Sequence, residues 1–276
     1  REDVLQWLDE ADSLGFTKAE VVNYLAKTTA KPSIVPILRN APERKLLWSG
    51  YQQRLVTSSR IKRGIEFAAE HTDQLNLMTK TTGVDGAIIA AIAGIESNYG
   101  ANMGQHLTLR VLVTLAFDYP RRSQFFQRQL AEFFRLCFSQ GLDPMLVKGS
   151  AAGAVGMGQF IPTSYLGYAV DFTGDGKRDI WSDNPTDALA STAAYLKRFG
   201  WTYGQPWGAE VRLPKGFNYG LAGERIKKQP SEWQAMGVRL IDGGALPNKG
   251  KASILLPAGA RGTAFVIYNN FHVIER

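Results

Sequence analysis

The chain has 276 residues, and its hydrophobic content of 45% is enough for a substantial core in one large domain or two smaller ones. Lysine and arginine total 32 against 25 acidic residues, and the net charge of +7 favours an anionic partner: nucleic acid, an acidic polysaccharide or lipid headgroups. Without a zinc-ligand cluster, a recognisable nucleic-acid-binding motif or a stretch of about 20 apolar residues, nucleic acid is not favoured and no membrane-spanning segment is expected.

Helical patterns fill most of the first 200 residues. Thr17 and Glu20 are spaced as a capping box, and three prolines indicate a loop over 31–42. A first helix is predicted over 2–14, closed by Gly15, and a second begins at the capping box. Two more are predicted over 43–56 and over 59–82, the last closed by Gly83.

Asp85 can cap a helix that runs from Gly86 to about Glu96 with the sequence GAIIAAIAGIE. A helix that is apolar on every side is buried all round or lies in a membrane, and this one is too short to cross a bilayer. It is therefore expected to be a central core helix. Further helices are predicted over 107–118, 121–139 and 162–170, and a short one is predicted to begin at Asp143-Pro144. The last begins with Asn184-Pro185 as its N-cap and N1 pair and runs to 199.

Two loops separate the later helices, one rich in glycine and alanine over 149–158 and one rich in glycine and aspartate over 171–183. The single cysteine, Cys137, lies in an apolar run, which predicts a buried thiol and excludes an internal disulfide. After Gly200 the pattern changes to short β-like runs between Gly/Pro turns, over 209–213, 253–256 and 263–268.

Glu96 follows ten residues without a charged or strongly polar side chain, and 97–100 end the helix. Partial burial and the negative end of the helix dipole both disfavour a carboxylate, so both raise the pKa of its carboxyl. A carboxyl that stays protonated near neutral pH can act as a general acid toward a glycosidic oxygen. The alternative is an ordinary surface residue at a helix end.

Four blocks follow one another along the chain: GIESNYG at 94–100, FDYPRR at 117–122, GSAAGAVGMGQFIPTSY at 149–165 and AVDFTGDG at 169–176. Together they resemble the B-type lytic murein transglycosylases, from roughly residue 1 to 276. The resemblance implies a mainly α (α+β) fold with a lysozyme-like catalytic core. The expected division is a helical N-terminal domain over 1–84, the core with its metal-binding loop (171–187) over 85–200, and a small β-containing segment over 201–276.

The resemblance also implies cleavage of the β-1,4 bond between N-acetylmuramic acid and N-acetylglucosamine in peptidoglycan, with a 1,6-anhydromuramoyl end as product. Glu96 would act as acid and then as base, with help from the substrate N-acetyl group, so a second carboxylate is not required. A hydrolytic muramidase and a non-catalytic peptidoglycan-binding protein remain as alternatives.

By the same resemblance, Ser150 and Gln159 would bind substrate beside the catalytic carboxyl, Tyr195 would line the cleft, and Arg121 and Arg122 would meet stem-peptide carboxylates. Taken alone, the first two are typical of loop caps, the third of a core, and the last pair of a solvated helix start. Basic charge at a helix N-terminus is unfavourable, which favours a functional reason for the pair.

The aspartate-rich loop has EF-hand spacing, with oxygen ligands at positions 1, 3, 5 and 9, glycine at 6 and a carbonyl at 7: Asp171, Thr173, Asp175, Asp179, Gly176 and Lys177. Position 12 is Ser182 rather than glutamate, and the family's later aspartate matches Asp187. A length difference leaves Asp183 as the alternative. A structural calcium or sodium ion is expected and no catalytic cofactor; a metal-free Asx-turn loop is the other interpretation.

The partners implied are peptidoglycan glycan strands and stem peptides, together with proteins of cell-wall synthesis or remodelling. The implied location is the periplasm, with a lipid anchor on the native precursor left open. Relatives continue past a strand over 271–276 into a Tyr-Asn motif and a final helix. The chain begins at Arg1 without a signal peptide and ends at Arg276, so a mature or trimmed form is expected, with weaker activity if that last piece is absent.

Overall fold

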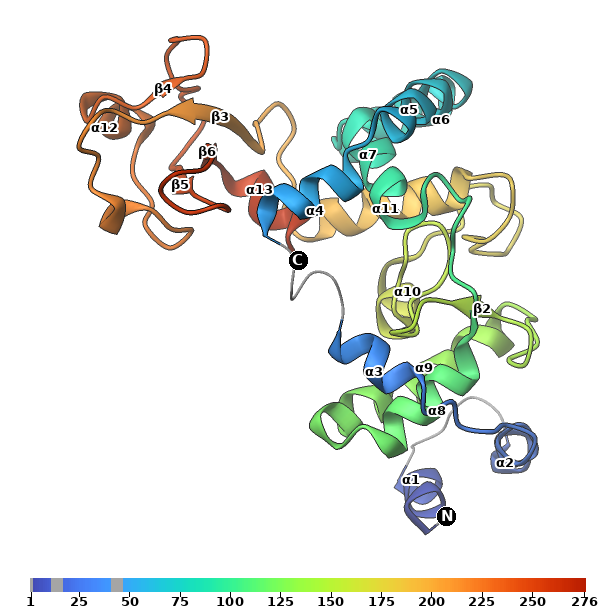
Figure 1. Cartoon of the computed structure of the whole chain (residues 1–276). Coiled ribbons are helices and arrows are strands. Elements are labelled where there is room, and N and C mark those ends of the chain that lie inside the picture. The colour runs from blue at the N-terminus through green and yellow to red at the C-terminus, as the bar shows by residue number, and fades with distance from the viewer. Residues whose placement is uncertain (1, 11–16, 41–46) are drawn as a thin grey trace.

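The computed structural model describes residues 2–10, 17–40 and 47–276 of a mainly helical protein (Figure 1). The α-helices are α1 (Glu2–Glu10), α2 (Lys18–Ala26), α3 (Ile34–Arg39), α4 (Trp48–Leu55), α5 (Ser58–Glu70), α6 (Thr72–Thr82), α7 (Gly86–Ser97), α8 (Thr108–Asp118), α9 (Ser123–Ser139), α10 (Pro162–Tyr168), α11 (Thr186–Arg198), α12 (Pro230–Ala235) and α13 (Asn269–Ile274). Short 3-10 helices cover Pro120–Arg122 (η2) and Tyr219–Leu221 (η3).

Two antiparallel sheets complete the described elements. The smaller pairs β1 (His106–Leu107) with β2 (Lys148–Gly149), with His106 opposite Gly149. The larger has the order β4-β3-β6-β5 and comprises β3 (Gly208–Arg212), β4 (Arg239–Leu240), β5 (Ser253–Leu255) and β6 (Ala264–Ile267). In Figure 1 this larger sheet and α12 lie to one side of the helical body, and α13 leads back toward α11.

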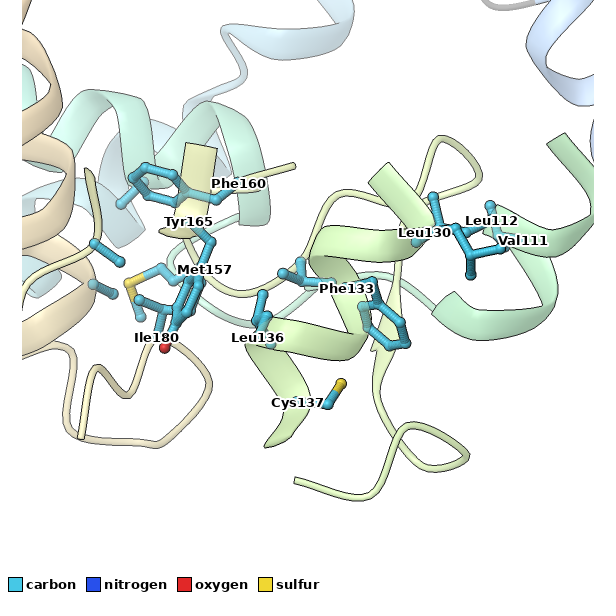
Figure 2. Close-up of a cluster of buried hydrophobic side chains, with 14 of the residues drawn as sticks. Val111, Leu112, Leu130, Phe133, Leu136, Cys137, Met157, Phe160, Tyr165 and Ile180 are labelled. Carbon is cyan, nitrogen blue, oxygen red and sulfur yellow. The ribbon is translucent and has the colours of Figure 1, made fainter. Parts of the chain in front are cut away.

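Side chains are buried in two separate hydrophobic clusters. The larger gathers residues from α1 to α11 together with Val273 of α13, and α8 and α9 supply much of its centre (Figure 2). Cys137 is buried there as predicted, and burial raises the pKa of its thiol. The smaller cluster lies under the larger sheet around Trp233, whose indole nitrogen donates to the Ala252 carbonyl at 2.9 Å. The domain boundaries at 84 and 200 stay a prediction.

Helix α7 is buried along one face rather than all round, which corrects the sequence prediction. Ile89, Ala93 and Ser97 are buried, whereas the side that carries Ile95 faces solvent, with 41% of that side chain exposed. Small alanines at the exposed positions make the sequence look uniformly apolar, although neighbouring elements cover only one face. The structure thereby opens the end of α7 to solvent.

Three helix predictions are corrected by features without a strong local signal. The proline-rich segment 31–42 contains α3, because Pro36 falls in the first turn, where a missing N–H costs no helical hydrogen bond. The predicted helix over 59–82 is two helices that meet at His71, the C-cap of one and the N-cap of the next. Asp143-Pro144 begins a turn, closed by the bond from Leu146 N to the Asp143 carbonyl, rather than a helix.

The chain end and the start of α11 also differ from prediction. The segment predicted as a strand over 271–276 belongs to α13. Helix α11 begins at Thr186, so its N-cap is Pro185 rather than the predicted Asn184. The Asn184 side chain still accepts a hydrogen bond from Thr186 N, although Asn184 lies one residue before the N-cap. The helices predicted over 2–14 and 43–56 correspond to α1 and α4 where the chain is described. The predicted residues 11–15 and 43–46 lie outside the described ranges. Across those ranges, no helix combines the length and apolarity needed to cross a membrane.

Candidate active site

The C-terminal turn of α7 carries Glu96 and is closed by an unusual cap. Asn98 is left-handed, with φ of 53°, and its N–H donates to the carbonyls of Ala93 and Gly94. The buried Ser97 hydroxyl donates to the Ala93 carbonyl at 3.1 Å and accepts from Gly100 N at 3.0 Å. These bonds satisfy helix-end groups and hold the turn that presents Glu96.

Tyr99 packs this turn against α5. Its backbone is also left-handed, with φ of 60°, and its hydroxyl donates to the Arg60 carbonyl at 3.3 Å. The phenol ring lies directly over Gly64 and Gly94, where any Cβ would collide with it. The ring also packs on Phe67, with centroids 5.1 Å apart. Glycines 64 and 94 are therefore needed for the close approach of the ring.

The Glu96 side chain is solvent-exposed, yet desolvation by the protein around it raises the pKa of its carboxyl above the usual 4.5. Water reaches one side of such a group while low-dielectric protein occupies the other sides, so the charged form is disfavoured. Among the described residues, no charged neighbour adds to or offsets this shift. The predicted upward shift is confirmed, with desolvation as its cause; the contribution of the helix dipole stays a prediction.

Ser150 begins the glycine-rich loop directly after β2. Its hydroxyl oxygen accepts hydrogen bonds from the backbone N–H of Ala152 at 3.2 Å and of Ala154 at 3.1 Å. The residue therefore caps its own loop, as its type alone suggests. The hydroxyl proton has no acceptor in these bonds and remains able to donate to a ligand.

Gln159 connects the glycine-rich loop to the segment that follows α7. Its side-chain nitrogen donates to the Met103 carbonyl at 3.2 Å and to the Gly156 carbonyl at 2.8 Å. The amide oxygen keeps its lone pairs for a further donor. The β1–β2 pair joins the same two segments, because β1 follows α7 and β2 precedes Ser150. Glu96, Ser150 and Gln159 thus stand on one hydrogen-bonded framework.

Backbone strain is concentrated on this framework. Within the described ranges, the non-glycine residues with positive φ are Asn98, Tyr99 and Gln159, the last with φ of 49°. Such conformations cost free energy and persist where surrounding contacts enforce them, often at functional sites. The two segments that carry the predicted catalytic and substrate-binding residues are therefore also the strained ones.

Tyr195 lies on α11 in an aromatic cluster. Its ring packs against Phe160, Tyr168 and Phe199, with centroid distances of 6.1, 5.2 and 4.6 Å. Burial raises the pKa of the Tyr195 hydroxyl. Phe160 follows Gln159 in the chain, so Tyr195 supports the glycine-rich loop through that ring, which is a packing role.

Arg121 and Arg122 are exposed in η2, beyond the far end of α8 from β1. The 11 residues of α8 separate them from the β1–β2 pair by about 16 Å along the helix. The guanidinium of Arg122 lies over the Phe125 ring, 4.1 Å from its centroid, which is a cation–π contact. The structure does not bring these arginines into the hydrogen-bonded framework around Glu96.

Three carboxylates of the predicted metal loop converge. Oxygen atoms of Asp171, Asp175 and Asp187 all lie within 4.8 Å of one another, whereas Asp183 is outside this group. In this geometry Asp187, rather than Asp183, lies beside the other two carboxylates. Hard oxygen donors of this kind are what calcium prefers, and the donor set fits such an ion. Thr173 and Lys177 lie in the same exposed loop, where the Thr173 hydroxyl donates to Asp171 at 3.4 Å.

Backbone N–H groups already organise this loop. Buried Asp187 accepts from the amides of Phe172, Thr173 and Asp179 at 2.9 to 3.0 Å. Asp171 accepts from Gly174, Asp175 and Gly176, and these bonds outweigh desolvation to lower the pKa of its carboxyl. The lowered pKa of Asp171 favours its anionic form, which is the form that a cation requires.

Two cavities lie outside this framework. One of about 670 Å³ is lined by α6, the start of α7 and the segment 201–207. Another of about 540 Å³ lies between α6 and α11. Neither is lined by Glu96, so the catalytic assignment rests on the framework and on the carboxyl itself.

Comparison with known proteins gives one consistent answer. A family model described as "Transglycosylase SLT domain" matches residues 1–276. The membrane-bound lytic murein transglycosylase B of Escherichia coli (strain K12) is 33% identical over 287 residues, which cover 98% of this chain and 76% of that protein.

Solved structures agree over the same length. SltB3 from Pseudomonas aeruginosa, in complex with NAG-NAM-pentapeptide, has a TM-score of 0.90 and 43% identity, covering 98% of this chain and 73% of that one. Lytic transglycosylase SLT35 of Escherichia coli, in complex with calcium, has a TM-score of 0.86 and 32% identity, covering 99% and 86%. These matches confirm the predicted mainly α, lysozyme-like fold class. The chain therefore belongs to the transglycosylase SLT domain family of lytic murein transglycosylases.

Proposed function

We propose that this lytic transglycosylase cleaves the β-1,4 bond between N-acetylmuramic acid and N-acetylglucosamine in peptidoglycan, with Glu96 as acid and then base. The observation that carries the proposal is the raised pKa of the Glu96 carboxyl on the strained framework. A carboxyl of this kind stays protonated closer to neutral pH and can donate to a glycosidic oxygen. The complex of SltB3 with NAG-NAM-pentapeptide supports the substrate class.

In the proposed reaction Glu96 gives up one proton and later takes one back. Glu96 donates its proton to the glycosidic oxygen, the bond from C1 of the muramic acid to that oxygen breaks, and N-acetylglucosamine leaves with a free hydroxyl. The substrate N-acetyl oxygen stabilises the positive charge at C1. The C6 hydroxyl of the same muramic acid then attacks C1 and returns its proton to Glu96, forming a 1,6-anhydro ring. The attack is intramolecular, so it outcompetes water.

Desolvation as the cause of the raised Glu96 pKa supports this route over hydrolysis. A retaining hydrolase places two carboxyls about 5 Å apart, and an inverting one about 6.5–9.5 Å apart. Neighbouring carboxylates at such short range perturb each other's pKa. The pKa of Glu96 shows no such partner among the described residues. One carboxyl that alternates between its two protonation states meets the needs of the transglycosylase.

The remaining site residues take supporting roles in the proposal. The free hydroxyl proton of Ser150 and the free amide oxygen of Gln159 would bind sugar groups beside Glu96. Tyr195 would complete the wall behind the loop, and exposed Arg121 would meet a stem-peptide carboxylate. Arg122 would share that charge while it stacks on Phe125.

The same proposal includes a structural cation and a cell-envelope location. Asp171, Asp175 and Asp187 would hold calcium, with the Thr173 hydroxyl and the Lys177 carbonyl as further ligands, as the calcium complex of SLT35 supports. The ion would stiffen the loop and would take no part in proton transfer. With this substrate the protein would act in the periplasm, where cell-wall synthesis or remodelling proteins would be its neighbours. The Escherichia coli relative is named as membrane-bound.

Product analysis of digested peptidoglycan tests the function. The parent protein is expected to release muropeptides with anhydro ends, seen by mass spectrometry. Glu96→Gln is expected to lower turnover by about 10²-fold or more while binding to insoluble sacculi persists. Glu66→Gln, which alters an exposed glutamate on α5, serves as the matched control. Reducing ends would indicate a hydrolase, and no release by the parent would indicate a binding protein. Full turnover by Glu96→Gln would refute the catalytic assignment.

A further inference from the structure

The cavity of about 670 Å³ lies at the opposite end of α7 from Glu96. Gly86, which lines it, precedes Glu96 by ten residues, or about 15 Å along the helix. Its volume is within the usual range for sites that bind small molecules. The cavity is thus large enough for a ligand of its own and stands apart from the catalytic carboxyl.

Aromatic rings and uncharged polar groups share the cavity lining with small and aliphatic residues. Trp201, Tyr203 and Trp207 contribute rings, with Tyr203 74% and Trp207 38% exposed. Asn76 and Gln205 contribute side-chain amides. Exposed rings offer apolar faces to a sugar ring, and amides bond hydroxyl and acetamido groups. This chemistry suits a neutral amino sugar.

Charge in the cavity argues against an anionic ligand. Among the described residues that line it, Asp85 is the charged group, and neither lysine nor arginine is present. The Asp85 carboxylate accepts from Ala87 N at 2.8 Å as the N-cap of α7, so it remains in place. The carboxylate of a muramyl peptide would be repelled by Asp85, and no cation among the described lining residues would compensate. N-acetylglucosamine carries no charge and would not be repelled.

The backbone of the segment that carries the aromatic residues is held in position by buried contacts. Asn270, fully buried, accepts from Thr202 N at 2.9 Å and donates to the carbonyls of Thr202 and Gln205 at 2.9 and 2.8 Å. Tyr203 sits over Gly83, where an added Cβ would lie 3.3 Å from the Tyr203 Cβ. The backbone of this segment is therefore ordered before a ligand arrives, which lowers the entropic cost of binding.

We propose that this cavity is a second glycan-binding site, which takes N-acetylglucosamine units of a peptidoglycan strand while Glu96 acts elsewhere on the strand. The proposal rests on the proposed function for its ligand class, since the substrate polymer repeats this neutral sugar. A second attachment point raises the effective concentration of the strand at the enzyme. Retention on insoluble sacculi, rather than the chemical step, is the property that this site would control.

Binding measurements in a Glu96→Gln background test the proposal without digestion of the polymer. Tyr203→Ala in that background is expected to bind sacculi at least about five-fold more weakly, as loss of an aromatic anchor does. Titration with N,N′-diacetylchitobiose, followed by tryptophan fluorescence, is expected to show the same loss. Tyr219→Ala, at another exposed tyrosine outside the cavity, is the matched control and should bind as the background does.

Asn76→Ala provides a second variant, because it removes an exposed amide and leaves the rings in place. It is expected to weaken chitobiose binding by a smaller factor than Tyr203→Ala. Equal binding by Tyr203→Ala, Tyr219→Ala and the background would overturn the proposal. That result would leave the catalytic assignment untouched, because the latter is judged by the products and turnover of the parent and Glu96→Gln.

Discussion

The side-chain amide of Gln159 donates a hydrogen bond to the Met103 carbonyl at 3.2 Å, joining two segments that are 56 residues apart in the chain. Met103 lies just beyond the cap that closes α7, and Gln159 ends the glycine-rich loop. This bond therefore links the segment that follows the Glu96 turn to the loop proposed to bind substrate. Its donor occupies a left-handed backbone conformation that glutamine rarely adopts.

Replacement of Gln159 by alanine removes both of its side-chain hydrogen bonds without relief of the backbone strain. We expect Gln159→Ala to lower the free energy of unfolding by about 1–3 kcal/mol. Turnover of sacculi should fall as well, because the loop is no longer held against the segment after α7. Gln127→Ala is the control: it deletes one bond, to the Ala116 carbonyl, and should retain turnover. Retained turnover in both variants would show that the bond does not position the site.

The desolvated carboxyl of Glu96 predicts a pH-dependent stability difference. Because its pKa in the folded state is raised, the folded protein binds this proton more tightly than the unfolded chain does. The associated stability is therefore present below 4.5 and lost as pH rises through the folded pKa. Glutamine does not titrate, so Glu96→Gln should melt at a higher temperature than the parent at neutral pH, with the gap closing below 4.5.

Thermal melts of both proteins across this pH range measure the effect. Glu70→Gln, at an exposed position at the end of α5, serves as the matched control with which the gain in Glu96→Gln is compared. A gap between Glu96→Gln and the parent that stays constant with pH would contradict the desolvation account. A more stable but inactive variant would also fit the general cost of catalytic groups to stability.

Features with a local cause were predictable from the sequence. Thr17 with Glu20 forms the expected capping box, and Asp85 caps α7 as expected, because each bond spans only a few residues. The catalytic candidate Glu96 was identified by its local pattern and motif. The convergence of Asp171 and Asp187 follows from the loop motif, although the sequence alone left Asp183 as an alternative.

Features that depend on distant contacts were not predictable in the same way. Helix α13 carries Asn270, whose bonds to Thr202 span 68 residues, so the short apolar pattern at the chain end resembled a strand. The exposed face of α7 depends on which elements cover the helix. The ring of Tyr99 over Gly64 joins two helices, and an isolated glycine in the α5 sequence was its only local sign.

The contact between Tyr99 and Gly94 predicts that a small substitution is costly. An alanine Cβ at position 94 would collide with the Tyr99 hydroxyl and ring. Alanine favours a helix over glycine by about 1 kcal/mol, but overpacking typically costs about 1–3 kcal/mol. We therefore expect Gly94→Ala to destabilise the protein and to reduce turnover, because the turn that carries Glu96 must shift.

Gly167→Ala is the matched comparison for this substitution. Gly167 lies in α10, and an added Cβ there meets no atom within 4 Å. Denaturant unfolding should show that Gly167→Ala is neutral or stabilising while Gly94→Ala is destabilised. Equal stability of the two variants would mean that the Tyr99 ring moves aside without cost.

Calcium binding to the aspartate loop is the last prediction, and Asp175→Asn tests it with the least structural change. Within the described part of the chain, Asp175 is exposed and accepts one backbone hydrogen bond, from Lys177 N at 2.8 Å, whereas Asp187 accepts three. In the presence of a chelator, the melting temperature of Asp175→Asn should be close to that of the parent protein. With added calcium the parent's melting temperature should rise, because the ion binds the folded state, and the rise should shrink in Asp175→Asn.

Asp183→Asn separates the metal site from general charge effects. Asp183 is an exposed aspartate in the same loop but lies outside the three-carboxylate group, so this variant removes the same charge without a proposed ligand. Its calcium-induced rise in melting temperature should match that of the parent. If the parent's melting temperature does not rise over a millimolar calcium titration, calcium binding is refuted. If the calcium-induced rise shrinks equally in both variants, the effect comes from the loss of charge alone.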